Sequence, residues 1–345
     1  MMTNEQWKIP SYSKKQVKKA GITVLKPDVD KDEYNAAIEV IDDYRAAHAY
    51  PLHVFYMNLR NKKGSRDDII VARRLKRLSS ILNKLEVQPY PNLKNMQDIG
   101  GCRMILPSVS EVFEYAEKLK KSRIRHIFIN EDDYINKPRE SGYRSLHHIY
   151  SFQSRSDEKK SYNNMRIEIQ FRSHLQHLWS TAVEMMGTFN GRNIKGGQGT
   201  PEEKRFFALT SSLFAIEEGY PIVPNTPDSI FEIVNELKML ESKYQLLEKL
   251  EGVRAAFTFQ ELHEKADYCL LILHLDLHKL EMIPYKQREL ESATEAYNYY
   301  ESLYLDSPVD VVLVSASSIS ELKKAYPNYF LDSNEFEMKI RNYLQ

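Results

Sequence analysis

Strict alternation between polar and apolar side chains in one segment constrains the fold more than any other feature of this sequence. The segment runs from Arg166 to Arg172 and reads Arg-Ile-Glu-Ile-Gln-Phe-Arg. Because successive side chains of a β-strand point to opposite faces of its sheet, the polar groups share one face and the apolar groups the other. Several polar groups on one face of a central strand indicate that this face borders a cleft and not a core.

The segments around this strand predict a mixed α/β fold. Apolar residues at steps of three and four predict helices over residues 32–59, 67–85, 109–121 and 174–187. Short apolar runs bounded by turn residues predict strands at 101–106, 125–129, 145–152 and 165–171. Strands and helices therefore alternate along the middle of the chain.

A proline-rich stretch between about Gly219 and Asp228 predicts a domain boundary. Beyond it, the sequence predicts a helix over 230–250, a strand over 266–277, a helix over 288–303, a strand over 309–315 and a terminal helix. We expect these two strands to be parallel and joined by a right-handed crossover. The predicted division is a helical arm at 1–58, a central domain at 59–220 and a smaller C-terminal domain, helical and α/β, at 221–345.

Composition excludes several classes of protein. Hydrophobic residues make up 42% of the 345-residue chain and charged residues 28%, which is typical of a globular protein and not of a disordered one. Lys plus Arg and Asp plus Glu each number 48, so no global charge draws the chain to nucleic acid or to an anionic membrane. Two cysteines and the lack of a long apolar run predict a cytoplasmic protein without membrane contact.

Basic residues gather between Arg60 and Lys84. One broad face of the helix predicted there would present Arg74, Lys76, Ser80 and Lys84. Such a face can bind several oxygens of a polyphosphate at once. The alternative is a solvated helix face, which is common for basic helices.

An acidic residue precedes a glycine pair and an arginine in the segment Asp-Ile-Gly-Gly-Cys-Arg, from Asp98 to Arg103. Glycine allows the backbone to turn and to approach a ligand closely. Carboxylate oxygens suit magnesium and a guanidinium suits phosphoryl oxygens, so the segment is a candidate metal ligand followed by a phosphate clamp. A simple ion pair between Asp98 and Arg103 is the alternative.

A third segment, from Asp133 to His147, contains a proline and a glycine that predict a turn. Tyr143 and Arg144 lie at the exit of this turn, where an aromatic plane and a guanidinium can meet a nucleobase. The alternative is a tyrosine that is merely half-buried.

Taken in chain order, four motifs resemble the synthetase domain of the RelA/SpoT alarmone enzymes. They are R-x-K-x-x-x-S-I-x-x-K from Arg74, D-I-G-G-x-R from Asp98, D-Y-I-x-x-P-x-x-x-G-Y-R-S-L-H from Asp133 and E-I-Q-x-R-x-x-x-x-H-x-W from Glu168. The resemblance covers roughly residues 34–187.

This resemblance implies a nucleotidyltransferase-like mixed sheet flanked by helices, and it implies a pyrophosphokinase. In such an enzyme the β,γ-pyrophosphate of ATP moves to the ribose 3′-hydroxyl of GDP or GTP, and AMP is released. Long members of the family have a separate hydrolase domain that uses a His-Asp pair. His48 and His53 are not followed by Asp, so we expect synthesis without hydrolysis.

Carried over residue by residue, the resemblance assigns roles to the motif positions. Asp98 and Glu168 would be catalytic and would hold Mg²⁺, with Glu168 as an alternative acceptor of the hydroxyl proton. Arg74 would lie against adenine, and Tyr143 would stack on the acceptor guanine. The full substrate-binding set would be Arg74, Lys76, Ser80, Lys84, Arg103, Lys137, Tyr143, Arg144, His147, Gln170 and Arg172.

Two other interpretations compete with this one. Toxic relatives share the motifs but transfer pyrophosphate to the 3′ end of tRNA, and basic residues such as Lys62 and Lys63 are candidates for contact with an RNA backbone. A catalytically silent binding module is the other interpretation, although retention of both Asp98 and Glu168 argues against it.

The C-terminal region shows no recognisable motif. It is predicted to pack on the synthetase domain as a restraint or a sensor, or to mediate contact with a second copy or a regulatory protein. In addition, His274, Asp276 and His278 alternate, so they would share one face of a strand and are candidates for a metal site.

Overall fold

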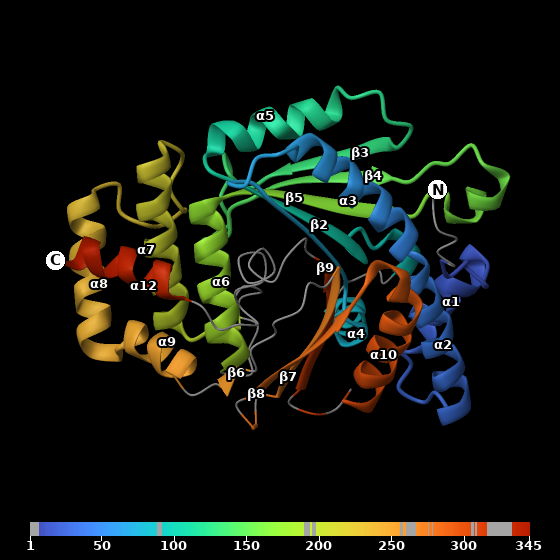
Figure 1. Ribbon diagram of the computed structural model, residues 1–345. Helices are drawn as coiled ribbons and strands as arrows, with labels where there is room; N and C mark the ends of the chain where they lie inside the picture. The colour runs from blue at the N-terminus through green and yellow to red at the C-terminus, as the bar shows by residue number, and fades with distance from the viewer. Residues whose placement is uncertain are drawn as a thin grey trace.

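The computed structural model describes residues 7–87, 92–189, 194, 198–255, 258–259, 267–274, 276–277, 279–304, 307, 309–315 and 333–345. Helices cover both faces of one twisted sheet, and a further group of helices lies at one end of the molecule (Figure 1). The N-terminal helices lie at the opposite end (Figure 1).

Three helices form the N-terminal end: α1 (Lys14–Thr23), α2 (Lys31–Ala47) and α3 (Ala49–Lys63). Asp30 caps α2 by accepting hydrogen bonds from the backbone N–H groups of Asp32 and Glu33. The helix predicted over 32–59 is confirmed, but it is divided at His48. α3 packs on the sheet.

The central strands are β1 (Ile70–Leu75), β2 (Gly100–Leu106), β3 (Ile127–Asp133), β4 (Leu146–Ser151) and β5 (Arg166–Ser173). They lie in the order β3-β4-β5-β2-β1. β2 and β5 are parallel, whereas the other neighbouring pairs among them are antiparallel. The alternation in β5 is confirmed, because Ile167 and Ile169 are fully buried while Glu168 and Gln170 are only partly buried.

The helix predicted over 67–85 is wrong in its first half. Ile70–Leu75 form β1, and the helix α4 (Leu78–Val87) begins only after it. The Ile-Ile-Val-Ala run that starts at Ile69 satisfies helical periodicity, but β-branched residues also suit a strand. Pairing of this segment with strands on both sides decides the outcome. Arg74 therefore lies in a strand, and Lys76 follows it outside the helix.

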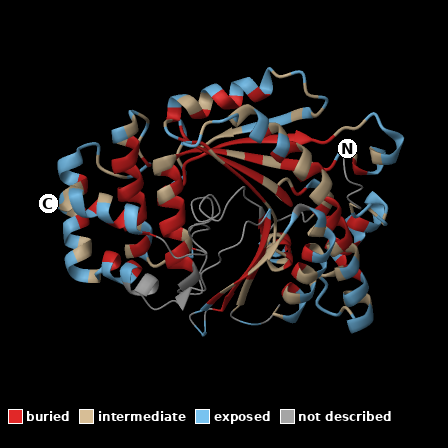
Figure 2. Cartoon of the chain, viewed as in Figure 1, coloured by how far each residue is buried: buried red, intermediate tan, exposed pale blue. Residues whose placement is uncertain are grey.

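The predicted helices at 109–121 and 174–187 are confirmed as α5 (Val109–Lys120) and α6 (His174–Phe189). The remaining helices of this part are α7 (Pro201–Glu218), α8 (Ile230–Tyr244), α9 (Leu246–Ala255) and α12 (Asn334–Leu344). α7 was not predicted, and the helix predicted over 230–250 is divided into α8 and α9. α7, α9 and α12 contact α6, and their facing sides are buried (Figure 2).

C-terminal strands extend the same sheet. They are β6 (Thr258–Phe259), β7 (Tyr268–His274), β8 (Lys279–Tyr285) and β9 (Val309–Ser315), and helix α10 (Leu290–Leu303) packs on β7 and β9. Over the described residues, the sheet has nine strands in the order β3-β4-β5-β2-β1-β9-β7-β8-β6. β9 pairs with β1, so the sheet continues across the boundary predicted near residue 220.

β7 and β9 are antiparallel, which corrects the prediction of a parallel pair. The unpredicted strand β8 explains the error. The chain reverses after β7 to form β8, and α10 then connects β8 to β9 across β7. The strands that run in the same direction are therefore β8 and β9, on either side of β7.

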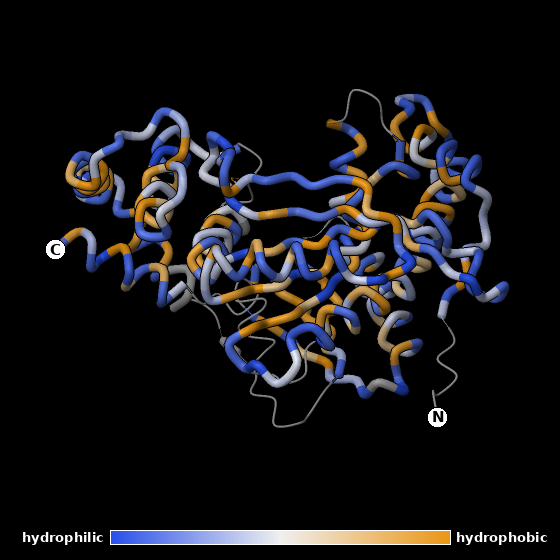
Figure 3. Tube along the Cα trace, turned by 90° about the horizontal axis from the view of Figure 1, so that it is seen from above, coloured by the Kyte–Doolittle hydropathy of each residue, from blue (hydrophilic) through white to orange (hydrophobic). Residues whose placement is uncertain are grey.

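Apolar segments concentrate in the interior, whereas many peripheral loops are hydrophilic (Figure 3). One buried cluster joins α6, α7, β9 and α12 through Trp179, Phe207, Val312 and Phe336. The C-terminal region thus shares a core with the central part of the chain. Short 3₁₀ turns occur at Leu93–Asn95, Asp157–Tyr162 and Gln287–Glu289. Within the described residues, the structure contains no helix with both the length and the apolar character that crossing a bilayer requires.

Candidate active site

The two predicted acidic residues lie on neighbouring strands. Parallel pairing of β2 with β5 sets Glu168 opposite Gly101, and Asp98 lies two residues before the start of β2. Both carboxylates line one small cavity of about 60 Å³, together with Arg74, Lys76, Gly101, Cys102, Arg103 and Gln170. Four residues of the predicted substrate or metal set are therefore brought to one place from β1, β2 and β5. Lys76 joins them from the turn after β1, and Asp98 from the segment before β2.

Asp98 is held between two lysines. The Nζ of Lys76 lies 2.9 Å from Oδ2 of Asp98, and the Nζ of Lys84 on α4 lies 2.9 Å from Oδ1. Burial acts to raise the pKa of Asp98, but the charges of the two lysines outweigh it and lower the pKa below its usual value. Asp98 is therefore a carboxylate at neutral pH, in contact with cations that can also face phosphate.

Glu168 is held by His147 and Gln170. Its Oε1 lies 3.0 Å from Nδ1 of His147, and its Oε2 accepts a hydrogen bond of 2.6 Å from Nε2 of Gln170. Burial acts to raise the pKa of Glu168, but His147 and Gln170 lower it to about 2. The opposite balance applies to His147: burial acts to lower its pKa, yet Tyr143 and Glu168 raise it to about 9.

Tyr143 belongs to the same network and is buried, with only 5% of its surface exposed. Its hydroxyl lies 2.7 Å from Nε2 of His147 and accepts a hydrogen bond of 3.0 Å from Arg172. The turn before it requires glycine, because Gly142 has φ +91° and a Cβ there would lie 2.7 Å from the Trp179 ring. The guanine-stacking role of Tyr143 stays a prediction, since its ring is packed among protein groups here.

The other predicted residues lie around this network or outside it. Ser80 is half-buried on α4, Lys137 is exposed in the loop after β3, and Arg172 is buried and binds Ser180. Arg144 points elsewhere: it is buried and pairs with Glu218 at the end of α7, 3.0 Å away. Sequence reasoning missed Glu218, because α7 itself was not predicted and nothing local relates it to Arg144.

The donor set fits magnesium. Mg²⁺ commonly binds proteins through one or two carboxylates and takes its other ligands from water and substrate phosphates. Asp98 and Glu168 provide two ionised carboxylates beside cationic side chains, which matches that pattern. Among the described residues, no group of three or more His, Cys, Asp or Glu side chains is arranged for a metal. The sequence also offered His274, Asp276 and His278 as candidate metal ligands, and His278 lies outside the described residues.

A comparison with known protein families matches the part of the chain that contains this site. Residues 73–188 match the family described as "Region found in RelA / SpoT proteins". This part of the chain is therefore similar to the RelA/SpoT family, and we call residues 73–188 the RelA/SpoT region. The matched region contains all the residues that line the small cavity. It begins on β1, inside the sheet that β9 extends.

Two curated relatives of the RelA/SpoT region come from Bacillus subtilis (strain 168). "GTP pyrophosphokinase YjbM" is 32% identical over 128 residues, which are 36% of this chain and 58% of the relative. "GTP pyrophosphokinase YwaC" is 30% identical over 113 residues, which are 31% of this chain and 52% of the relative. The chain thus spans little more than half the length of these relatives.

A solved structure similar to the chain is that of the small alarmone synthetase 1 from Bacillus subtilis bound to its product pppGpp. It shares 24% sequence identity with a TM-score of 0.42, over 59% of this chain and 94% of that chain.

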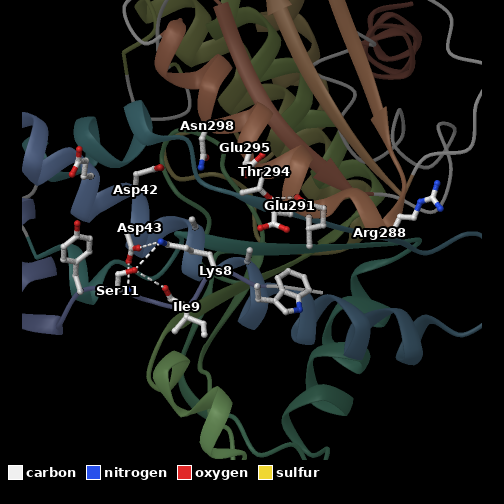
Figure 4. A pocket seen from close by; sticks show the side chains of 16 residues that line it. Lys8, Ile9, Ser11, Asp42, Asp43, Arg288, Glu291, Thr294, Glu295 and Asn298 are labelled. Carbon is white, nitrogen blue, oxygen red and sulfur yellow. Dashed lines mark hydrogen bonds and ion pairs between the residues drawn. The ribbon is translucent and has the colours of Figure 1, made fainter. Parts of the chain in front are cut away.

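A larger cavity of about 880 Å³ lies outside the RelA/SpoT region (Figure 4). The N-terminal arm, α2 and α10 line it, and none of its lining residues was predicted as a site residue. Lys8 points toward Asp43 and Ser11 in this cavity, and its Nζ lies 2.8 Å from the Asp43 carboxylate (Figure 4).

Proposed function

We propose that the protein transfers the β,γ-pyrophosphate of ATP to the 3′-hydroxyl of GDP or GTP. The observation that carries this proposal is the convergence of Asp98 and Glu168 on one cavity beside Lys76 and Arg103. Phosphoryl transfer depends mainly on positioning two substrates and neutralising charge, and two carboxylates among fixed cations supply those functions. The similarity to proteins named GTP pyrophosphokinase supports the same reaction.

The residues divide the work in this proposal. A Mg²⁺ ion on Asp98 and Glu168 would neutralise phosphate charge. Lys76 and Lys84, which pair with Asp98 here, would turn to the phosphates of ATP, while Arg103 would clamp them. His147 keeps Glu168 ionised at neutral pH, so Glu168 is ready to hold the metal or to receive the hydroxyl proton.

Product analysis tests the acceptor. The protein is incubated with labelled ATP, Mg²⁺ and GDP, GTP or deacylated tRNA in separate reactions, and the products are identified by mass. We expect a guanine nucleotide with two added phosphates and an equal amount of AMP. If the label appears on tRNA and on neither guanine nucleotide, this proposal is wrong and the tRNA alternative holds.

The first prediction concerns the carboxylates. Asp98→Asn and Glu168→Gln each remove a metal ligand charge, so each is expected to lower kcat on the order of 1000-fold, since the metal contributes several kcal/mol to the transition state. Initial rates at saturating substrates measure the effect. Asp157→Asn is the control, because that side chain is 91% exposed and pairs with a surface lysine, Lys160. Activity above a tenth of wild type in both site variants would remove the proposed metal site.

A further inference from the structure

Two acidic residues of the C-terminal region contact the turn that joins β1 to α4 and the first residue of α4. We call Lys76 and Arg77 the β1–α4 turn. The backbone N–H of Leu78, which directly follows this turn, donates a hydrogen bond of 2.6 Å to Oε1 of Glu301 on α10. Arg77 forms an ion pair with Asp310 on β9. The C-terminal region therefore contacts the segment that presents Lys76 to Asp98.

Glu301 is buried within a charged cluster. Only 6% of its surface is exposed, and Arg45 on α2, itself 2% exposed, pairs with it. The hydroxyl of Tyr297 donates a hydrogen bond of 3.1 Å to the same carboxylate. Arg45 also donates hydrogen bonds to Tyr297, Asp42 and Asn298. Asp42 and Asn298 border the larger cavity. Buried charges are tolerated only when they are paired, so this cluster strongly favours one arrangement.

Helix α4 needs an acceptor at its N-terminus that its own sequence does not supply. The carbonyl of Arg77 accepts the first helical hydrogen bond, from Ile81 at 3.0 Å, so Arg77 occupies the N-cap position. N-cap side chains normally accept hydrogen bonds, but arginine has only donors, and so does Lys76 before it. Glu301, from a distant part of the chain, thus provides the acceptor that an N-cap side chain would normally provide.

The turn and the end of β1 before it are each fixed at one further point. The backbone N–H of Lys76 donates to the carbonyl of Ile99 at 2.8 Å, next to Asp98. Arg74 pairs with Val314 of β9 across the sheet. The side expected to hold ATP is therefore built jointly by the RelA/SpoT region and the C-terminal strands. Tyr143 and His147 are held by contacts that involve neither Glu301 nor Asp310.

We propose that Glu301 is a positioning residue for ATP: by capping α4 and holding the β1–α4 turn, it places Lys76 and Lys84 for the phosphates. This inference rests on the proposed function. It makes the C-terminal region a structural part of the ATP side of the site. It also predicts different effects on the two substrates: loss of Glu301 should weaken the binding of ATP and leave the binding of the acceptor unchanged.

The test uses the full chain and the variants Glu301→Gln and Glu301→Asp. Initial rates are measured against ATP at saturating acceptor and against acceptor at saturating ATP, and binding of a non-hydrolysable ATP analogue with Mg²⁺ is measured by calorimetry. We expect Glu301→Gln to raise the KM for ATP and the Kd of the analogue about tenfold, with the acceptor KM within about twofold of wild type. Glu301→Asp retains the charge and should recover part of the ATP affinity.

Glu295→Gln is the matched control, because Glu295 is an exposed glutamate on the same helix. It should leave both KM values and the analogue affinity unchanged. If Glu301→Gln does not fold, Asp310→Asn takes its place, since it removes the other acidic contact with the turn at a less buried position. An unchanged ATP KM, or an equal rise in both KM values, would overturn the positioning role. A wild-type protein that binds the analogue but forms no product would instead count against the proposed function.

Discussion

At the scale of single residues, Gly142 connects backbone geometry to the site. Its φ of +91° is unfavourable for other residues, and an added Cβ would meet the Trp179 ring at 2.7 Å and the carbonyl of Phe207 at 2.9 Å. The turn therefore packs against α6 and α7 at the residue directly before Tyr143. Substitution here should disturb stability and the tyrosine together.

We predict that Gly142→Ala lowers the free energy of unfolding by about 2–4 kcal/mol, because backbone strain and a steric clash act together. Urea denaturation measures this change. Gly64→Ala is the control: Gly64 also has a positive φ, +61°, but nothing lies within 4 Å of the added Cβ. Gly64→Ala should lower the free energy of unfolding through backbone strain alone, by about 1–2 kcal/mol. Equal losses in the two variants would show that the contact with Trp179 is unimportant.

His48 provides a residue-scale prediction for pH. It is fully buried, and burial lowers its pKa to about 4, although its ring donates a hydrogen bond to the carbonyl of Tyr44. The unfolded chain protonates this histidine below pH ~6.5, whereas the folded protein keeps it neutral down to about pH 4. Its contribution to stability is therefore complete above pH ~6.5 and is lost as pH falls, at about 1.4 kcal/mol per pH unit.

Unfolding free energies at pH 7.5 and pH 5.0 test this linkage. From pH 7.5 to pH 5.0, the free energy of unfolding of the wild type should fall by about 2 kcal/mol more than that of His48→Gln. The variant has no group that titrates at this position. The variant is expected to be less stable at pH 7.5, so the comparison is between the two pH dependences. Identical pH dependences would contradict the prediction.

At the scale of elements, local sequence was informative where an element depends on its own residues. The alternation in β5 and the motif that leads into β2 predicted both strands. Four predicted residues of these segments line the small cavity: Asp98, Arg103, Glu168 and Gln170. The same approach failed for β1, whose β-branched residues suit either a helix or a strand until β2 and β9 pair with it. It also missed β8, and that omission reversed the predicted direction of β9 relative to β7.

The part of the site that sequence did not predict depends on long-range contacts. Glu218 and Glu301 lie in no motif, and each is recognisable only through its partner, Arg144 or Leu78, far away in the chain. Helical periodicity explains why Glu301 is on the buried side of α10 but not which backbone group it meets. Motifs thus identified groups that line the small cavity, and the fold was needed to identify the groups that hold them in place.

At the scale of the whole molecule, the continuous sheet makes the C-terminal strands part of one structure with the RelA/SpoT region. A chain that ends at residue 220 would leave β1 without its neighbour β9. It would also leave Arg45 without Glu301 and Arg73 without the Tyr268 hydroxyl, which lies 2.6 Å away. Loss of one partner of a buried charge and exposure of a strand edge both destabilise a fold.

We therefore predict that the 1–220 fragment aggregates or unfolds below the temperature of the full chain, with no activity at matched concentration. Size-exclusion chromatography, thermal unfolding and product formation measure these properties. Addition of the separate 221–345 segment is expected to recover part of the soluble species by pairing with β1. A monomeric 1–220 fragment with wild-type turnover would show that the C-terminal strands are dispensable.

The shared strand β1 also affects how heritable changes in this protein would be distributed. Because one of its edges belongs to β2 and the other to β9, a genetic selection for lost nucleotide transfer should recover substitutions near the C-terminus as well as in the motifs. For the same reason, a RelA/SpoT region that evolves without such strands must protect the bare edge in another way, through a covering loop, a charged border or a second polypeptide.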